Sequence, residues 1–204
     1  MASFVEAPTK QKYDYFLVLD FEATCDEKNP PHPQEIIEFP VLKINGKTFI
    51  CESIFHMYVL PKENPKLTEF CINLTGITQD MVDNQLYLEK VLELFHEWLI
   101  EQDLLNKQFT FVTCGDWDLK TMLRSQCQHF NIERQEYFRQ WVNIKRSYNE
   151  FLNSKSNRGM MGMLNGLNLT HEGRHHSGID DCKNIAKILK ELAERGYIYE
   201  QNGK

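Results

Sequence analysis

The 204-residue sequence lacks the features that mark several special classes of protein. It has no apolar run approaching the ~20 residues that a membrane-spanning helix requires, and its first residues lack a signal-peptide core. Its six cysteines include no CxxC pair, which argues against a disulfide framework or a zinc site. Internal repeats and low-complexity tracts are absent too. We therefore expect one domain with free thiols, without membrane contact, in the cytosol or the nucleus.

An excess of positive charge is also missing. The chain has 29 Asp and Glu against 23 Lys and Arg, which gives a net charge of −6. A protein that coats nucleic acid through phosphate contacts alone is usually basic. An acidic chain can still hold the end of a strand if bound cations supply the positive charge. The charge thus argues against a coating protein, and only weakly against a metal-dependent nuclease.

Apolar runs and turn residues alternate in a pattern that predicts one mixed α/β domain. Residues 1–12 are polar and irregular, so we expect a mobile lead-in there and a single domain over residues 13–204. The pattern predicts strands at residues 15–21, 36–44, 48–59, 109–114 and 141–144, the second and third joined by the left-handed turn that Asn45-Gly46 favours. It predicts helices at 69–74 and 79–82 (capped by Thr68 and Thr78), at 86–99, from 117 to about 130, and at 179–195, closed by Gly196.

Two acids follow the first apolar run, in the segment FLVLDFEAT. Side chains two apart on a strand point to the same face, so Asp20 and Glu22 are expected to project together from the carboxyl end of a central strand. Open α/β sheets place their ligands at that edge. Two adjacent carboxylates repel each other, and a bound cation would relieve the repulsion. The alternative is a pair of loop acids without a ligand.

A third acid, Asp118, lies in the segment GDWDLK at the start of the predicted helix. The helix dipole favours a carboxylate in the first turn even without a metal. Asp116 directly follows Gly115 and is the better candidate for the helix cap. Asp118 is then left without a structural role and becomes a candidate ligand.

The last predicted helix distinguishes two neighbouring acids by periodicity. Asp181 shares a stripe with the apolar residues Ile185, Ile188 and Leu192, which we expect to face the core. Asp180 shares the opposite, solvated stripe with Asn184, Lys187 and Glu191. A carboxylate on a buried face is costly unless it is paired or bound to metal. We therefore expect Asp181 to be the functional acid and Asp180 a surface or capping residue.

A histidine, His176, lies in a loop between Gly173 and Gly178, five residues before Asp181. Histidine titrates near neutral pH and can take a proton from an attacking water molecule. Its neighbour His175 is expected to be an ordinary surface residue. Carboxylate oxygens are preferred ligands of Mg²⁺ and Mn²⁺, and two such ions about 4 Å apart can assist phosphodiester hydrolysis. The acids and the histidine together predict a two-metal nuclease.

The segments DFEAT, CGDWDLK and GRHHSGIDDCKN together resemble the DEDDh 3′→5′ exonucleases. HPQEIIEFP and FCINLTGIT extend the resemblance to the ERI-type exoribonuclease branch, over residues 13–199. The resemblance implies an RNase H-like α/β fold, with a mixed five-stranded sheet flanked by helices. It also implies release of 5′-mononucleotides from the 3′ end of single-stranded RNA, with DNA as the alternative substrate. Asp20, Glu22, Asp118 and Asp181 would hold two Mg²⁺ or Mn²⁺ ions, and His176 would be the general base.

The same resemblance implies substrate contacts. The backbone of Ala23 and Thr24 would meet the terminal ribose, and the 3′-terminal base would pack against Phe70, Leu74 and Trp117. Phe70 and Leu74 could instead be ordinary core residues. Trp117 directly precedes Asp118, and stacking of a base on its ring would not depend on which base it is. Five basic residues could guide the strand or form a solvated face: Arg139, Lys145, Arg146, Lys155 and Arg158.

Three other functions stay open at this point. A catalytically weak nucleic-acid or protein-binding module on the same fold would usually have lost an acid or the histidine, and all five residues are present. An RNase H-type endonuclease would share the acids but lack a histidine five residues before the last one. A hydrolase of small nucleotides is the third. Family members that bind stem–loop RNA carry a further N-terminal domain for which this sequence leaves no room, so we expect a nuclease module alone.

Overall fold

The computed structural model describes residues 10–204, so most of the expected lead-in lies outside the described residues. Gln11 is buried, its side chain donates to the carbonyl of Tyr197 at 2.9 Å, and it accepts from the amide of Tyr199 at 3.0 Å. The chain is therefore packed against its C-terminal segment before the expected boundary at residue 13. Within the described part, no helix is long and apolar enough to cross a membrane.

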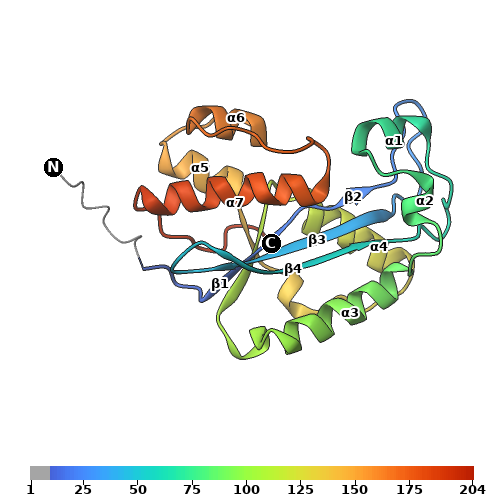
Figure 1. The fold of residues 1–204 in the computed structure, drawn as a ribbon, viewed down its shortest axis with the longest axis horizontal. Coiled ribbons are helices and arrows are strands. Elements are labelled where there is room, and N and C mark those ends of the chain that lie inside the picture. Colours follow the sequence, from blue (N-terminus) through green and yellow to red (C-terminus); the bar gives the residue numbers. More distant parts are fainter. Residues whose placement is uncertain (1–9) are drawn as a thin grey trace.

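A mixed sheet forms the centre of the domain (Figure 1). β1 (Tyr15–Leu19) pairs antiparallel with β3 (Ile36–Asn45) and parallel with β5 (Phe109–Thr113), which pairs in parallel with β6 (Trp141–Asn143). On its other side β3 pairs antiparallel with β4 (Cys51–Tyr58). The sixth strand, β2 (Glu22–Ala23), continues the line of β1 along β3. The predicted mixed sheet is thus confirmed, with five longer strands and the two-residue β2.

Helices cover both faces of the sheet (Figure 1). Alternate residues of β1 point to opposite faces, so Leu17 and Leu19 enter one core and Phe16 and Val18 enter another. The first core is closed by α3 (Leu88–Glu101) and α4 (Leu123–His129). The second is closed by α5 (Ile144–Phe151), α6 (Met160–Gly166) and α7 (Gly178–Glu194). Among residues 10–204, the remaining α-helices are α1 (Glu69–Thr75) and α2 (Gln79–Val82), and 3₁₀ turns lie at Leu104–Asn106 and Glu136–Phe138.

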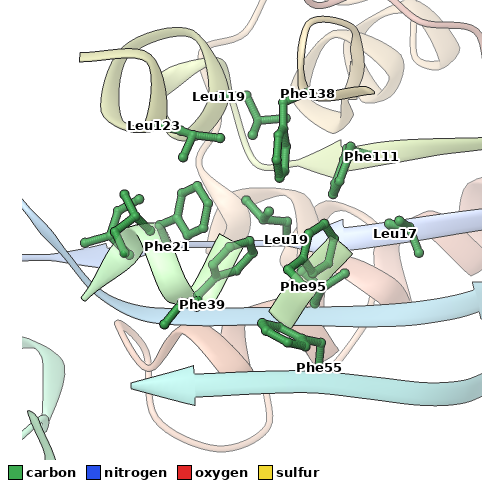
Figure 2. Packing of buried hydrophobic residues seen from close by; sticks show 14 of the residues in the cluster. Leu17, Leu19, Phe21, Phe39, Phe55, Phe95, Phe111, Leu119, Leu123 and Phe138 are labelled. Atoms are coloured by element: carbon green, nitrogen blue, oxygen red, sulfur yellow. The ribbon is translucent and has the colours of Figure 1, made fainter. Parts of the chain in front are cut away.

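The core beneath α3 is rich in phenylalanine (Figure 2). The ring of Phe95 lies 5.1 Å from that of Phe39 and 5.2 Å from that of Phe55, between ring centroids. On the other side of Phe95, Phe138 lies at 5.7 Å and itself stacks on Phe111 at 5.0 Å. Aromatic pairs at these separations are worth about 0.5–1.5 kcal/mol each beyond the area they bury. These pairs link β3, β4 and β5 through α3, and β1 lies between β3 and β5 in the sheet, so the carboxyl ends of β1 and β5 are fixed relative to each other.

Several local predictions need correction. β1 ends at Leu19, two residues before its predicted end, because the chain leaves the ladder at Asp20. The predicted helix from residue 117 begins as a π-helical turn, Trp117–Met122, in which the amide of Leu123 donates to the carbonyl of Asp118. Two further helices, α5 and α6, lie where no element was predicted.

The hairpin between β3 and β4 also turns differently from the prediction. The residue with a left-handed backbone is Phe49 (φ 54°), and the side chain of Asn45 accepts from the amides of Lys47 and Thr48. Gly46 is needed for space, since a Cβ there would lie 2.1 Å from the carbonyl oxygen of Tyr13. At the end of α7, the predicted stop is confirmed: Gly196 has φ 97°.

Candidate active site

The predicted acids come from three distant segments and meet at one edge of the sheet. Asp20 and Glu22 follow β1, and Asp118 follows β5, whose carboxyl end lies at the same edge because the two strands are parallel. A cleft of about 280 Å³ is lined by Asp20, Glu22, Asp118 and His176. Asp181 borders it, since the ligand atoms of Glu22, His176 and Asp181 all lie within 4.8 Å of one another. The structure therefore brings all five residues together.

Asp118 has a structural contact that the sequence did not indicate. It is buried, and its Oδ1 accepts from the amide of Phe21 at 2.9 Å. This bond ties the turn between Asp20 and Glu22 to the start of the π-helical segment. The two acids are thus placed by this turn and by β2, rather than by one continuous strand.

Asp116 lies at the predicted cap position, but its side chain does not cap the helix. Its Oδ1 accepts from the indole of Trp141 at 3.1 Å and from the amide group of Asn143 at 2.9 Å. Its carboxylate also pairs with Arg146, which removes that arginine from the predicted set of free strand-guiding residues. Asp116 therefore fastens the π-helical segment to β6.

A buried acid that sequence reasoning missed, Glu38, holds the start of α7. Its two carboxylate oxygens accept from the amides of Gly178 at 2.9 Å and Ile179 at 3.2 Å. A carboxylate at this end of a helix is favoured by the helix dipole. Glu38 is the one acid inside the apolar run of β3, and that isolation in IIEFPV was the signal that could have identified it.

The approach of α7 to the sheet depends on Gly178. A Cβ at this position would lie 2.6 Å from the carbonyl oxygen of Asp20 and 3.0 Å from Glu38. Glycine allows the helix start to touch the end of β1. Asp181, one turn further along, is thereby brought to the cleft.

The burial of Asp181, predicted from the periodicity of α7, is confirmed. Asp181 is buried, as are Ile185, Ile188 and Leu192 on the same stripe. Asp180 instead accepts from the amide of Arg174 at 3.0 Å and pairs with Lys183, contacts that lower its pKa. The predicted solvated stripe is wrong at Asn184, which is fully buried and hydrogen-bonded to the backbone of Glu172.

His176 is held in an unusual backbone conformation, with φ 66°. Its amide donates to Oδ2 of Asp181 at 3.0 Å, and its ring stacks on that of His175, with centroids 4.0 Å apart. Burial and the neighbouring His175 lower the pKa of His176 below its ordinary value. At neutral pH the imidazole is therefore uncharged and able to accept a proton.

Burial and mutual repulsion raise the pKa values of the carboxyl groups in the cleft. The pKa of Asp20 lies well above its usual range, owing to burial and then to Asp118 and Glu22. Burial and the facing Glu38 raise the pKa of Glu22 to about 9, and burial raises the pKa of Asp118 to about 6. Lys145 acts against the shift at Asp118, and its Nζ lies near Gly115. Acidic side chains therefore greatly outnumber basic ones around the cleft.

Only some of the predicted substrate residues line the cleft. Ala23, Leu74 and Trp117 line the cleft, and the Trp117 side chain is 40% exposed. Phe70 is also exposed, one turn before Leu74 on α1, but it does not belong to the cleft lining. The amide of Thr24 donates to the carbonyl of Glu35, so this backbone group already has a partner. Sequence reasoning missed four lining residues, Phe21, Cys25, Gln34 and Cys114.

Arg174 joins the loop of His176 to α1. Its guanidinium donates to the carbonyls of Asn73 and Leu74 at the carboxyl end of that helix. The helix ends at Gly76 (φ 77°), where a Cβ would lie 2.8 Å from the Nε of Arg174. The loop and the helix that carries Leu74 are therefore directly connected.

A family model described as Exonuclease matches residues 17–189. The chain belongs to this exonuclease family. Human ERI1 exoribonuclease 3 is 55% identical over 206 aligned positions, which cover all of this chain and 60% of that protein. Human 3′-5′ exoribonuclease 1 is 41% identical over 94% of this chain and 56% of its own length. The chain thus spans 60% and 56% of the length of these two relatives.

A solved structure of the same family confirms the predicted fold. The nuclease domain of 3′hExo, a DEDDh family member bound to rAMP, superposes with a TM-score of 0.92 at 39% identity. The match covers 96% of this chain and all of that domain. The RNase H-like fold predicted for the exonuclease is therefore confirmed, and dependence on metal ions is typical of this family.

Proposed function

We propose that this chain is a metal-dependent 3′→5′ exoribonuclease that releases 5′-mononucleotides from the 3′ ends of single-stranded RNA. The meeting of Asp20, Glu22, Asp118, Asp181 and His176 at one cleft carries the proposal. Membership of the exonuclease family supports it, as does the rAMP bound to the 3′hExo domain. The proposal extends to single-stranded DNA ends.

The donor atoms of the cleft suit hard divalent cations. Its carboxylates offer oxygen, the ligand type that Mg²⁺ and Mn²⁺ prefer. Burial raises the pKa values of Asp20, Glu22 and Asp118, and repulsion by neighbouring carboxylates adds to it at Asp20 and Glu22, so bound cations would stabilise the ionised acids. Asp20, Glu22, Asp118 and Asp181 would hold two Mg²⁺ or Mn²⁺ ions. When bound, the ions would stabilise the charge on the attacking and leaving oxygens of the phosphodiester.

The other residues would prepare the reaction. His176 is uncharged at neutral pH, so one imidazole nitrogen would take the proton from the attacking water. Its backbone bond to Asp181 fixes the ring beside the acids. The exposed face of Trp117 would stack on the terminal base, with Leu74 on the cleft wall beside it. Lys145, whose Nζ lies near Gly115, would meet the strand's phosphates.

The test is a 5′-labelled single-stranded RNA incubated with Mn²⁺, with and without EDTA. We expect progressive shortening from the 3′ end that EDTA abolishes. His176→Ala should lower the rate by about 10²–10⁴-fold, because the general base is lost. His129→Ala is the matched control: this histidine pairs with Glu63 outside the cleft lining, and its removal should leave the rate unchanged.

Three outcomes would favour other functions. Retention of the strand without shortening would indicate a binding module on the same fold. Cuts within a circular strand would indicate an endonuclease. Hydrolysis of free nucleotides but not of oligomers would indicate a small-nucleotide hydrolase. A DNA oligomer of matched sequence measures the preference for RNA.

The cellular compartment is part of the same proposal. All six cysteines, which lie in the described part of the chain, are free thiols. Free thiols fit a reducing compartment, so we propose the cytosol or the nucleus as the place of action.

A further inference from the structure

Asp181 belongs to a second group of side chains besides the carboxylates of the cleft. The ligand atoms of His171, His175 and Asp181 all lie within 4.8 Å of one another. We propose that these three residues bind a transition-metal ion such as Zn²⁺, at a site that shares Asp181 with the nuclease cleft. This site would inhibit the reaction when it is filled.

The distances between the side chains support a metal site. Nδ1 of His175 lies 3.2 Å and 3.3 Å from the two carboxylate oxygens of Asp181, and Nε2 of His171 lies 3.9 Å from Oδ1. Tetrahedral ligands with bonds of about 2.0–2.1 Å lie roughly 3.3 Å apart. Small side-chain rotations would therefore bring the three donor atoms onto one ion.

His171 provides an independent indication. Its Nε2 is buried and has no hydrogen-bond partner among residues 10–204. A buried polar atom without a partner costs about 1–3 kcal/mol. A metal ion would satisfy this nitrogen. The half-exposed His175 leaves the group open to ions from solution.

The backbone around His171 is fixed by α7. The buried Asn184 accepts from the amide of Glu172 at 3.0 Å and donates to its carbonyl at 2.8 Å. On the other side, Nζ of Lys187 donates to the carbonyl of Thr170 at 3.1 Å. Asp181 belongs to the same helix. The backbone that carries His171 and Asp181 is thus fixed before any ion arrives, which favours binding.

The ligand chemistry differs from that of the cleft. Imidazole nitrogen suits Zn²⁺, Cu²⁺ and Ni²⁺, whereas Mg²⁺ and Mn²⁺ prefer oxygen. Two histidines and one carboxylate are a known ligand set of zinc sites that keep a fourth position open. Zinc at this site would engage Asp181, which the proposed nuclease needs for its own ion. Inhibition rests on the proposed function, but binding does not.

Binding is tested first, by isothermal titration of the metal-free chain with Zn²⁺ and by the absorption spectrum of Co²⁺ in its place. We expect His171→Ala and His175→Ala each to weaken Zn²⁺ binding by about tenfold or more, and His129→Ala to have no effect. His175 is exposed, so its variant should keep the fold even if the His171 variant does not; circular dichroism verifies both. Wild-type affinity in a folded His175→Ala variant would overturn the proposal. So would a loss of Zn²⁺ binding in Glu22→Gln while both histidine variants still bind, because the ion would then lie among the carboxylates of the cleft.

Inhibition is tested second, by titrating Zn²⁺ into RNA cleavage at excess Mg²⁺, each variant being compared with its own zinc-free rate. We expect half-inhibition of His175→Ala to need about ten times more Zn²⁺ than the wild type. Equal sensitivity would overturn the inhibitory role. If no RNA is cleaved at all, the proposed function fails while the binding measurement still decides whether the metal site exists.

Discussion

Replacing Glu22 by glutamine tests the electrostatics of the cleft without any substrate. Glu22 is buried and faces Glu38 across the β2–β3 ladder. Burial and Glu38 raise the pKa of Glu22 from 4.5 to about 9. Between these two values the metal-free fold keeps a proton that the unfolded chain has released. The fold binds more protons, so its free energy of unfolding is highest at low pH and falls as the pH rises through this window.

The magnitude follows from the size of the shift. Each pH unit inside the window costs the metal-free fold up to about 1.4 kcal/mol at this one group. From about pH 6.5 to 8.5, above the pKa of about 6 at Asp118, the loss due to Glu22 amounts to at most about 3 kcal/mol. Glutamine has the shape of the protonated acid and does not titrate. The variant should therefore lose less stability over this range, by up to that amount.

The assay is urea unfolding of both proteins in EDTA at several pH values across this range. Glu27→Gln, at an exposed loop acid, is the matched control and should follow the wild type. Adding Mn²⁺ should stabilise the wild type, most strongly at the highest pH, because the ion binds the folded state with ionised acids. If the free energy of unfolding of the wild type and of Glu22→Gln changed with pH in the same way in EDTA, the reasoning would be refuted. Glu22 would then have the same pKa in the folded and the unfolded protein.

Three further predictions concern other parts of the fold. Gly178→Ala should destabilise the protein by about 1–3 kcal/mol, since its Cβ would meet the carbonyl of Asp20; thermal unfolding measures this, and an unchanged midpoint would contradict it. Trp117→Ala should weaken RNA binding by about 10–100-fold while the variant's melting temperature stays near that of the wild type, as fluorescence anisotropy and thermal melting would show. Phe95→Ala should cost about 3–5 kcal/mol in urea unfolding, because the ring is fully buried among six other aromatic rings; a loss below 1 kcal/mol would disprove its central place.

The site was easier to predict from the sequence than the path of the chain around it. Asp181 could be separated from Asp180 because a 17-residue helix repeats its pattern often enough to show which face is buried. The turn that breaks the ladder after Leu19 could not be predicted, since Asp20 and Glu22 look like a continuing strand. It depends on the amide of Phe21 finding Asp118, 97 residues away.

Short or weakly patterned elements were missed for related reasons. α6 contains two glycines in seven residues, so its local preference for a helix is weak, and packing in the second core decides its structure. α5 buries Ser147 beside Tyr148, which hides its apolar face. The metal-binding role that we propose for His171 could not be predicted from the sequence, because only the fold places this loop residue beside Asp181.

The hydrogen bonds from Arg174 to the carbonyls of Asn73 and Leu74 connect α1 to the loop of His176, so that a movement of one is transmitted to the other. A strand end that pushes on Leu74 would displace the imidazole as well. In the proposed reaction, a poorly seated terminal nucleotide would therefore shift the histidine that we propose as the general base, so that correct seating and readiness for cleavage would both depend on this guanidinium group.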